Sequence, residues 1–334
     1  MHAQTLFFTA PGQVEIRQTP LPPLTQGQLL VETICSAISP GTEMLVYRGQ
    51  FPKGLTDAHD TLSSKLEYPM PYGYATVGRV VKITKDMRHR WKDRLVFAFK
   101  PHSSHFIATP DELLPLPEGI SPETACFLPT METAVNLVQD GAPVLGERAL
   151  VLGQGIIGLL TTALLNKFPL ETLIAADRYS MRRDTSLELG VKNCFDPDAE
   201  DFRVQASTQD GYDLTFELSG SPSALNDAIA LTGFGGRIVI GSWYGDKQAT
   251  LDLGGDFHRS RIKLISSQVS TIAPELSARW DKSRRFKVAW DALERIQPEK
   301  WITHRFPLHE AGQAYRLLDK NPQETIQVLF TYQG

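Results

Sequence analysis

The sequence has few cysteines, no long apolar run and little net charge, and each absence removes a class of protein. Its three cysteines, Cys35, Cys126 and Cys194, are widely spaced and odd in number, which argues against a disulfide framework and a CxxC zinc lobe. No stretch approaches the roughly 20 apolar residues that span a bilayer, and the N-terminus lacks the pattern of a signal peptide. We therefore expect a cytoplasmic protein with no membrane partner.

The charge balance does not indicate a nucleic-acid-binding surface. The formal net charge is −4 and the pI is near 6.1, and the most basic run, Lys282–Lys287, is typical of a solvated helix face. A length of 334 residues with 42% hydrophobic residues indicates a soluble protein of about two domains. We predict no nucleic-acid partner and a small-molecule substrate.

The pattern of apolar residues changes along the chain. Up to about residue 115, short apolar or alternating segments separated by Pro, Gly and Asp predict an antiparallel, barrel-like or sandwich-like unit. From the candidate helix N-cap Ser121 to Gln268, strands and helices alternate, which predicts a parallel sheet covered on both faces. Two helices, over 282–296 and 310–319, and a strand over 325–332 follow. This tail is too short for a domain, so we expect it to pack on the N-terminal unit.

The sharpest motif is the segment ALVLGQGIIGLL, in which Gly153, Gly155 and Gly158 follow a buried strand and precede a helix. In a G-x-G-x-x-G loop the first glycine allows a tight turn, the second lets backbone amides approach a pyrophosphate, and the third lets helix and strand pack closely. The helix N-terminus at Ile156 and Ile157 points N–H groups at the phosphate. We predict a dinucleotide site; the alternative is a glycine-rich turn that binds nothing.

The end of the next strand bears on which dinucleotide binds. Asp177 lies about 20 residues after the loop, where a carboxylate can accept hydrogen bonds from the adenosine ribose and repels a 2′-phosphate. Arg178, Arg182 and Arg183 follow at once, and they can pair with the phosphate of NADP or be exposed helix residues. We favour NAD over NADP.

A β-rich N-terminal unit, a Rossmann unit and a short return segment together resemble the medium-chain dehydrogenase/reductase superfamily. The segments VETICSAISPGTEMLVYRG, MPYGYATVGRVV, DRLVFAF and ACFLPTMETAV resemble its landmarks along nearly the whole chain. The resemblance implies an α/β fold: a doubly wound parallel Rossmann sheet over 125–268, and a β-rich GroES-like, partly open barrel from 1–124 and 269–334 that forms the catalytic domain. It also implies hydride transfer between nicotinamide and a hydroxyl or carbonyl substrate, in a homodimer.

The chain departs from the family at the catalytic zinc ligands. Where the family has Cys-Gly-Thr-Asp this chain has Pro40–Glu43, and where it has Gly-His-Glu this chain has Gly73–Ala75. Cys126 lies near the third ligand position, but zinc needs three protein ligands. We expect no zinc, as in a branch that lacks these ligands and includes the bacteriochlorophyllide dehydrogenases. The preceding Tyr72 is expected to be a plain strand residue.

Family positions also nominate catalytic residues. Thr42 matches a hydroxyl that passes a proton from the substrate alcohol, although a turn threonine is often a cap. Glu43 matches an acid that supports the site; the alternative is that it holds a loop by hydrogen bonding. Tyr74, in place of a zinc ligand, either donates its proton to a carbonyl oxygen, orients the substrate, or fills the space left by the metal. His105 is a further candidate beside His102, although the alternative is a polar loop with one packed histidine.

Further cofactor contacts are expected from family position and from the ends of later strands: Thr133, Ser219, Gly220, Gly241 and Ser242. Two other functions stay open. One is NADPH-dependent reduction of an activated C=C bond in a quinone or enoyl substrate. The other is nucleotide binding without turnover.

Overall fold

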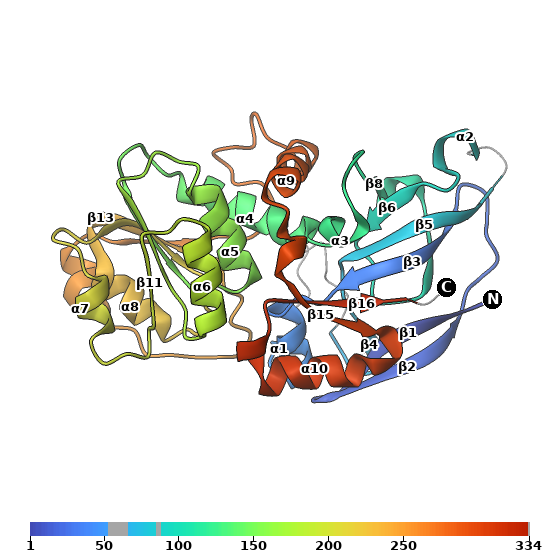
Figure 1. The fold of residues 1–334 in the computed structure, drawn as a ribbon, viewed down its shortest axis with the longest axis horizontal. Helices are drawn as coiled ribbons and strands as arrows, with labels where there is room; N and C mark the ends of the chain where they lie inside the picture. Colours follow the sequence, from blue (N-terminus) through green and yellow to red (C-terminus); the bar gives the residue numbers. More distant parts are fainter. Residues whose placement is uncertain (53–65, 85–87, 333–334) are drawn as a thin grey trace. The chain divides into compact units, whose positions relative to one another are not determined.

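The computed structural model describes residues 1–52, 66–84 and 88–332 (Figure 1). In this part of the chain, no helix is long and apolar enough to cross a membrane. The strands fall into one parallel sheet and two sheets that are mainly antiparallel, so the α/β fold expected from the sequence is confirmed.

Contacts divide the chain into two units. One consists of Met1–Pro129 with Leu293–Gly334, and the other of Thr130–Ala292. Residues 269–292, which the sequence pattern assigns to the return segment, thus group with the parallel sheet.

The first unit contains the β-rich part of the chain. Its larger sheet has the order β15-β16-β3-β5-β6-β8, with β7 paired to β3, and its smaller sheet has the order β2-β1-β4. The strands are β1 (His2–Ala10), β2 (Gln13–Pro20), β3 (Leu29–Ala37), β4 (Met70–Pro71), β5 (Thr76–Ile83), β6 (Leu95–Ala98), β7 (His105–Ala108), β8 (Leu114–Pro115), β15 (Ile302–Pro307) and β16 (Gln327–Thr331). The helices are α1 (Thr42–Arg48), α2 (Arg88–Trp91), α3 (Pro122–Ala125) and α10 (Ala311–Lys320), with 3-10 turns η2 (Pro110–Glu112), η4 (Pro298–Trp301), η5 (Leu308–Glu310) and η6 (Pro322–Glu324).

Helix α10 covers the core of this unit, which explains why the tail returns to it. Its apolar face brings Tyr315 and Leu318 into one buried cluster with Leu6 and Phe8 of β1. Figure 1 shows α10 running beside β1 and β2. The strand after it, β16, pairs antiparallel with β3 and thereby joins the C-terminal segment to the N-terminal sheet.

The second unit is a parallel sheet in the order β11-β10-β9-β12-β13-β14. The strands are β9 (Arg148–Leu152), β10 (Thr172–Ala176), β11 (Asn193–Phe195), β12 (Tyr212–Glu217), β13 (Thr232–Ile240) and β14 (Lys263–Ser266). The helices are α5 (Ile156–Leu165), α6 (Ser180–Glu188), α7 (Phe202–Ala206), α8 (Ala224–Leu231) and the π-helical turn η3 (Leu253–Phe257); α4 (Leu128–Gly141) and α9 (Lys282–Ile296) cross into the first unit. Two buried clusters lie on its strands, as the continuous apolar runs predict.

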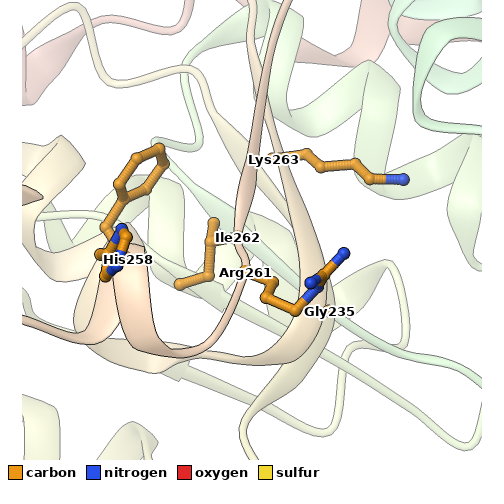
Figure 2. A pocket seen from close by; sticks show the side chains of 6 residues that line it. Gly235, His258, Arg261, Ile262 and Lys263 are labelled. Atoms are coloured by element: carbon orange, nitrogen blue, oxygen red, sulfur yellow. The ribbon is translucent and has the colours of Figure 1, made fainter.

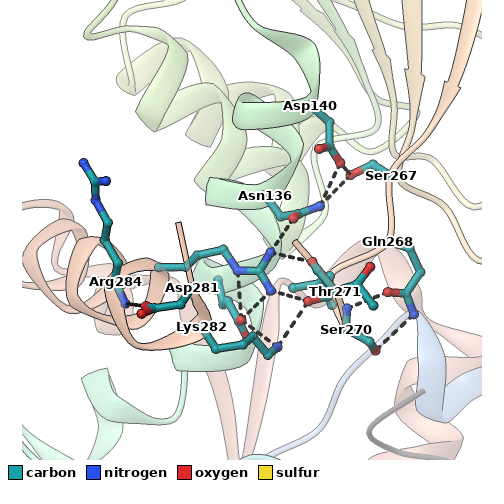
Figure 3. Close-up of polar contacts among 12 residues, drawn as sticks. Asn136, Asp140, Ser267, Gln268, Ser270, Thr271, Asp281, Lys282 and Arg284 are labelled. Atoms are coloured by element: carbon teal, nitrogen blue, oxygen red, sulfur yellow. Dashed lines mark hydrogen bonds and ion pairs between the residues drawn. The ribbon is translucent and has the colours of Figure 1, made fainter. Parts of the chain in front are cut away.

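A fully buried arginine on α9 accounts for the grouping of 269–292 with this sheet. Arg285 Nε and Nη2 donate to Glu132 Oε1 at 3.0 and 2.8 Å, and Arg285 Nη1 donates to Asn136 Oδ1 at 2.5 Å. Lys282 Nζ also donates to Glu132 Oε1, at 2.9 Å (Figure 3). The prediction that Lys282–Lys287 is a solvated face is therefore wrong for Arg285, because two acceptors on α4 compensate for its loss of water.

The same guanidinium holds the loop that follows β14. Arg285 Nη1 donates to the backbone carbonyl of Thr271 at 2.9 Å, and Nη2 donates to the carbonyl of Val269. Ser267, at the start of the loop, donates to Asp140 Oδ2 on α4 at 2.6 Å (Figure 3). Helix α4 thus carries the acceptors that fix both ends of this connection.

Candidate functional site

The glycine loop lies between β9 and α5, and each of its glycines has a distinct steric setting. Gly153 has φ +95°, and a Cβ there would lie 2.6 Å from the backbone of Ser219. A Cβ on Gly158 would lie 1.9 Å from the carbonyl oxygen of Gly153, so α5 reaches the turn only because this residue has no side chain. A Cβ on Gly155 would meet only Arg182 Nη1, at 3.7 Å, which leaves the start of α5 open for a ligand.

Asp177, which directly follows the neighbouring strand β10, is hydrogen-bonded to the glycine loop. It is buried, its Oδ2 accepts from the backbone N–H of Gln154 at 2.7 Å, and its Oδ1 accepts from the N–H of Tyr179 at 2.9 Å. The side chain of Gln154 is also buried and accepts from Thr162 and Ser186, both at 3.0 Å. The loop, α5, α6 and the end of β10 therefore form one hydrogen-bonded unit.

The three arginines after Asp177 point to different partners. Arg178 is half exposed and lies 3.5 Å from Asp198, and Arg183 pairs with Asp196 at 2.9 Å. Arg182 lies 4.0 Å from Asp177 Oδ2 and stacks over a tyrosine ring. Burial lowers the pKa of Arg182, although the carboxylate of Asp177 opposes that effect. Of the three, Arg182 is the cation beside Gly155.

The candidates at the ends of later strands lie together at the same edge. Gly220 N donates to Ser242 Oγ at 2.9 Å, so the turns after β12 and β13 are joined. Ser219 N donates at 2.8 Å to the buried carboxylate of Glu217. Tyr244 also donates to Glu217, at 2.5 Å, and burial together with this carboxylate raises the pKa of Tyr244.

Helix α4 lies against this edge of the sheet. A Cβ on Gly241 would lie 2.5 Å from Leu137 Cδ2, so the end of β13 needs glycine to approach the helix. Thr133, the remaining candidate, is half-buried on α4 about one turn before Leu137. The predicted cofactor residues of this unit thus gather around the carboxyl ends of its strands, where doubly wound folds bind ligands.

A hollow of about 400 Å³ lies at the opposite edge, by the amino ends of β13 and β14. It is lined by Gly235, Phe257, His258, Arg261, Ile262 and Lys263. Figure 2 shows His258 and Lys263 on opposite sides of Ile262, pointing away from one another. Because its basic side chains do not converge, this hollow offers no defined anion site.

In the first unit, Glu43 is the centre of a buried polar cluster. Its Oε1 accepts from the N–H of Ser39 at 2.8 Å, and its Oε2 accepts from His102 Nε2 at 3.0 Å and from Tyr315 Oη at 2.5 Å. His102 Nδ1 lies 2.7 Å from Ser36 Oγ. Burial, and then the negative charge of Glu43, raise the pKa of Tyr315 well above its usual value. The carboxylate of Glu43 therefore accepts hydrogen bonds from three donors.

Tyr74 lies at the edge of this cluster and is half-buried. Its hydroxyl donates to Ser39 Oγ at 2.5 Å. Tyr72 is not a strand residue as predicted: it lies between β4 and β5, where Gly73 has φ +109° and interrupts the extended backbone. Its ring is buried in edge-to-face contact with Phe8 and Tyr74.

The other two catalytic candidates differ in their surroundings. Thr42 is half-buried and begins α1, directly before Glu43. His105 Nδ1 lies 3.1 Å from Ser104 Oγ, and its Nε2 lies 3.8 Å from Glu32. Burial lowers the pKa of His105. The described contacts thus bring Glu43 and Tyr74 together through Ser39 and leave His105 outside the cluster.

In the part of the chain that the structure describes, the donor set does not fit a catalytic zinc ion. Among residues 1–52, 66–84 and 88–332, no three His, Cys, Asp or Glu side chains are grouped so as to hold a metal. Cys126 instead contacts Cys35, with the two Sγ atoms 3.4 Å apart and both buried. Burial raises the pKa of the Cys126 thiol, which disfavours the thiolate that zinc binds.

Several residues of these two sites are not among the candidates predicted from the sequence. Gln154 and Glu217 are buried polar residues within or next to the segments that carry the predicted cofactor residues. Their position in the sequence could therefore have identified them as candidates. His102 is the packed histidine of its loop, and its contacts lie 59 and 66 residues away in the sequence. No local pattern points to them.

Comparisons with known proteins relate the chain to dehydrogenases. The family described as "Zinc-binding dehydrogenase" matches residues 157–286. L-galactonate-5-dehydrogenase of Escherichia coli is 28% identical over 236 residues, which cover 69% of this chain and 65% of that protein. The chain spans 61 to 65% of the length of the first curated relatives it matches.

Two solved structures from Escherichia coli share the fold. An oxidoreductase/dehydrogenase of unknown specificity has a TM-score of 0.82 at 15% identity, with full coverage of both chains. An alcohol dehydrogenase complexed with NADH has a TM-score of 0.78 at 19% identity, with 99% of each chain covered. These likenesses show that the fold is shared with two proteins described as dehydrogenases. In sequence, the chain is similar to the zinc-binding dehydrogenases of the medium-chain dehydrogenase/reductase superfamily.

Proposed function

We propose that the protein is an NAD(P)-dependent dehydrogenase that transfers a hydride between nicotinamide and a hydroxyl or carbonyl group of a small polyol or sugar acid. The observation that carries this proposal is the glycine loop, with its open helix N-terminus at Gly155 and the carboxylate of Asp177 bonded to the loop itself. The match to L-galactonate-5-dehydrogenase supports the substrate class.

The residues of the second unit fit a dinucleotide. Backbone N–H groups at Ile156 and Ile157 would receive the pyrophosphate, and Asp177 would face the adenosine ribose. Thr133, Gly220 and Ser242 would line the remainder of the cofactor site. NAD is favoured over NADP because Asp177 is a fixed carboxylate, whereas two of the three neighbouring arginines already have acidic partners.

Residues of the first unit would transfer the proton of the substrate hydroxyl. A bound nicotinamide supplies the acceptor for a hydride from the carbinol carbon, and the hydroxyl proton then has to leave through protein groups. Tyr74 and Thr42 both carry half-buried hydroxyls; Tyr74 is hydrogen-bonded to Ser39, whose N–H donates to Glu43, and Thr42 directly precedes Glu43 in the chain. We propose that these two hydroxyls transfer the proton of the substrate hydroxyl, and that the buried Glu43 supports them.

We also propose that the reaction needs no zinc and that the chain belongs to a branch lacking the ligands; the bacteriochlorophyllide-dehydrogenase-like affinity stays a prediction. The mismatched donor set supports this. A homodimer is proposed as well, since β14 is an edge strand with exposed Leu264 that a second copy could extend. Light scattering after size-exclusion chromatography tests that assembly.

Titration with NADH and NADPH, followed by cofactor fluorescence and quenching of the five tryptophans, tests the proposal. We expect binding with a preference for NADH, and reduction of NAD⁺ with one or more secondary polyols or sugar acids. A preference for NADPH with activity on enones would favour C=C reduction. Binding without any turnover would favour a nucleotide-binding protein, and no binding at millimolar cofactor would refute the proposal.

A further inference from the structure

The cluster around Glu43 holds Tyr74 from two sides. At the hydroxyl end, Tyr74 donates to Ser39 Oγ, and the backbone N–H of the same serine donates to Glu43 at 2.8 Å. At the backbone end, Tyr74 follows Gly73, and a Cβ on Gly73 would lie 2.6 Å from the His102 ring. The imidazole therefore packs against the Cα of the residue before Tyr74.

His102 and Glu43 belong to one fully buried unit. Both side chains have no exposed surface, and their hydrogen bond measures 3.0 Å. Because an ionised carboxylate only accepts, Nε2 of His102 carries the proton in this contact, while Nδ1 lies 2.7 Å from Ser36 Oγ. Ser36 Oγ in turn lies 2.7 Å from Tyr332 Oη.

The cluster joins segments that are distant in sequence. Ser36 lies in β3, Glu43 in α1 and Tyr315 in α10, and Tyr332 follows β16. A buried carboxylate with a full set of donors is costly to disturb, since the loss of one partner leaves the charge uncompensated. Such a centre can define the position of a neighbouring side chain more sharply than apolar packing does.

From this geometry we propose that His102 and Glu43 are positioning residues that fix the hydroxyl of Tyr74 for proton transfer. The inference rests on the proposed dehydrogenase function and extends it to His102, a residue outside the predicted catalytic set. His102 acts through Glu43 and Ser39 and through its contact with Gly73, and it does not itself touch the substrate.

Substitutions at His102 separate its two contacts. Gln can present its amide near the place of Nε2 and keep the donation to Glu43, whereas Asn reaches only the place of Nδ1 beside Ser36. We expect His102→Asn to lower kcat at least about tenfold and His102→Gln to retain most of it. The exposed His309→Gln is the matched control and should leave kcat unchanged.

A double-mutant cycle with Tyr74→Phe tests whether His102 acts through the tyrosine. We expect Tyr74→Phe to lower kcat about 10²-fold, within the range for general acid–base groups. In that background, His102→Asn should cause little further loss. Multiplicative losses, or a kcat of His102→Asn within threefold of wild type, would overturn the proposal.

Two further measurements keep the outcome interpretable. NADH affinity should be unchanged in every variant, because the predicted cofactor loop lies in the other unit; wild-type protein that binds no NADH would refute the proposed function instead. If His102→Asn does not fold, Tyr315→Phe removes one donor from Glu43 at nearly constant volume, and the same cycle with Tyr74→Phe is measured. Additive effects there would equally overturn the proposal.

Discussion

Alanine at two glycines of the same loop should have opposite effects on stability and binding. At Gly158, the new Cβ would lie 1.9 Å from the carbonyl oxygen of Gly153, whereas carbon–oxygen contacts normally begin near about 3.3 Å. Helix and turn must therefore separate by more than about 1 Å. Overpacking of this kind typically costs about 1–3 kcal/mol, which corresponds to roughly 2–12 °C in Tm for a domain of this size.

At Gly155 the new Cβ would meet nothing closer than Arg182 Nη1, at 3.7 Å, so folding loses only about 0.5–1 kcal/mol from a poorer N-cap. The methyl group would instead obstruct a pyrophosphate at the start of α5. We expect Gly155→Ala to weaken NADH binding at least about tenfold, or about 1.4 kcal/mol, with nearly wild-type Tm.

Calorimetric titration with NADH and thermal unfolding on the same samples measure both effects. Gly254→Ala, at a glycine with open surroundings away from the loop, is the control and should change neither quantity. Unchanged NADH affinity in Gly155→Ala would refute the assignment of this loop as the phosphate site.

Three further predictions concern charged groups of the second unit. Arg285→Met leaves Glu132 buried with only Lys282 as its cation, and should lower the free energy of unfolding by about 3–5 kcal/mol in urea titrations. Burial alone would raise the pKa of Glu147, but hydrogen bonds, chiefly from Arg237, lower it below 4.5 overall. The Glu147 carboxylate therefore contributes fully to the free energy of unfolding above its pKa in the unfolded chain, and this contribution is lost as the pH falls through its lower pKa in the folded protein. The loss of stability caused by Glu147→Gln should accordingly become smaller from pH 7 to pH 3. Asp177→Asn removes charge at constant shape and should raise the affinity for NADPH relative to NADH in paired titrations.

Elements with a strong local signal could be predicted from the sequence. The glycine loop and its flanking strand and helix are one example, and the helix at Lys282–Ile296 is another, because its apolar residues recur at helical spacing. Strand ends such as Ser219 and Ser242 meet at one edge because parallel strands present their carboxyl ends together.

The remaining features depend on contacts between distant segments. Arg285 belongs to a basic run that resembles a solvent-exposed face, and its burial follows from acceptors 149 and 153 residues away. His102 likewise finds Glu43 and Ser36 only in the folded unit. Strand β11 has three residues, too few for a recognisable alternation. Residues 269–292 group with the parallel sheet for the same non-local reason as Arg285.

Dehydrogenase turnover without zinc is the feature that most distinguishes the proposed reaction from that of zinc-binding relatives, and it can be measured. Initial rates of NAD⁺ reduction with a panel of secondary polyols and sugar acids are recorded on protein whose zinc content is measured before and after chelation. We expect turnover that is independent of zinc content and is not raised by added zinc. Activity that rises in proportion to bound zinc, or turnover that chelation abolishes and zinc restores, would contradict it.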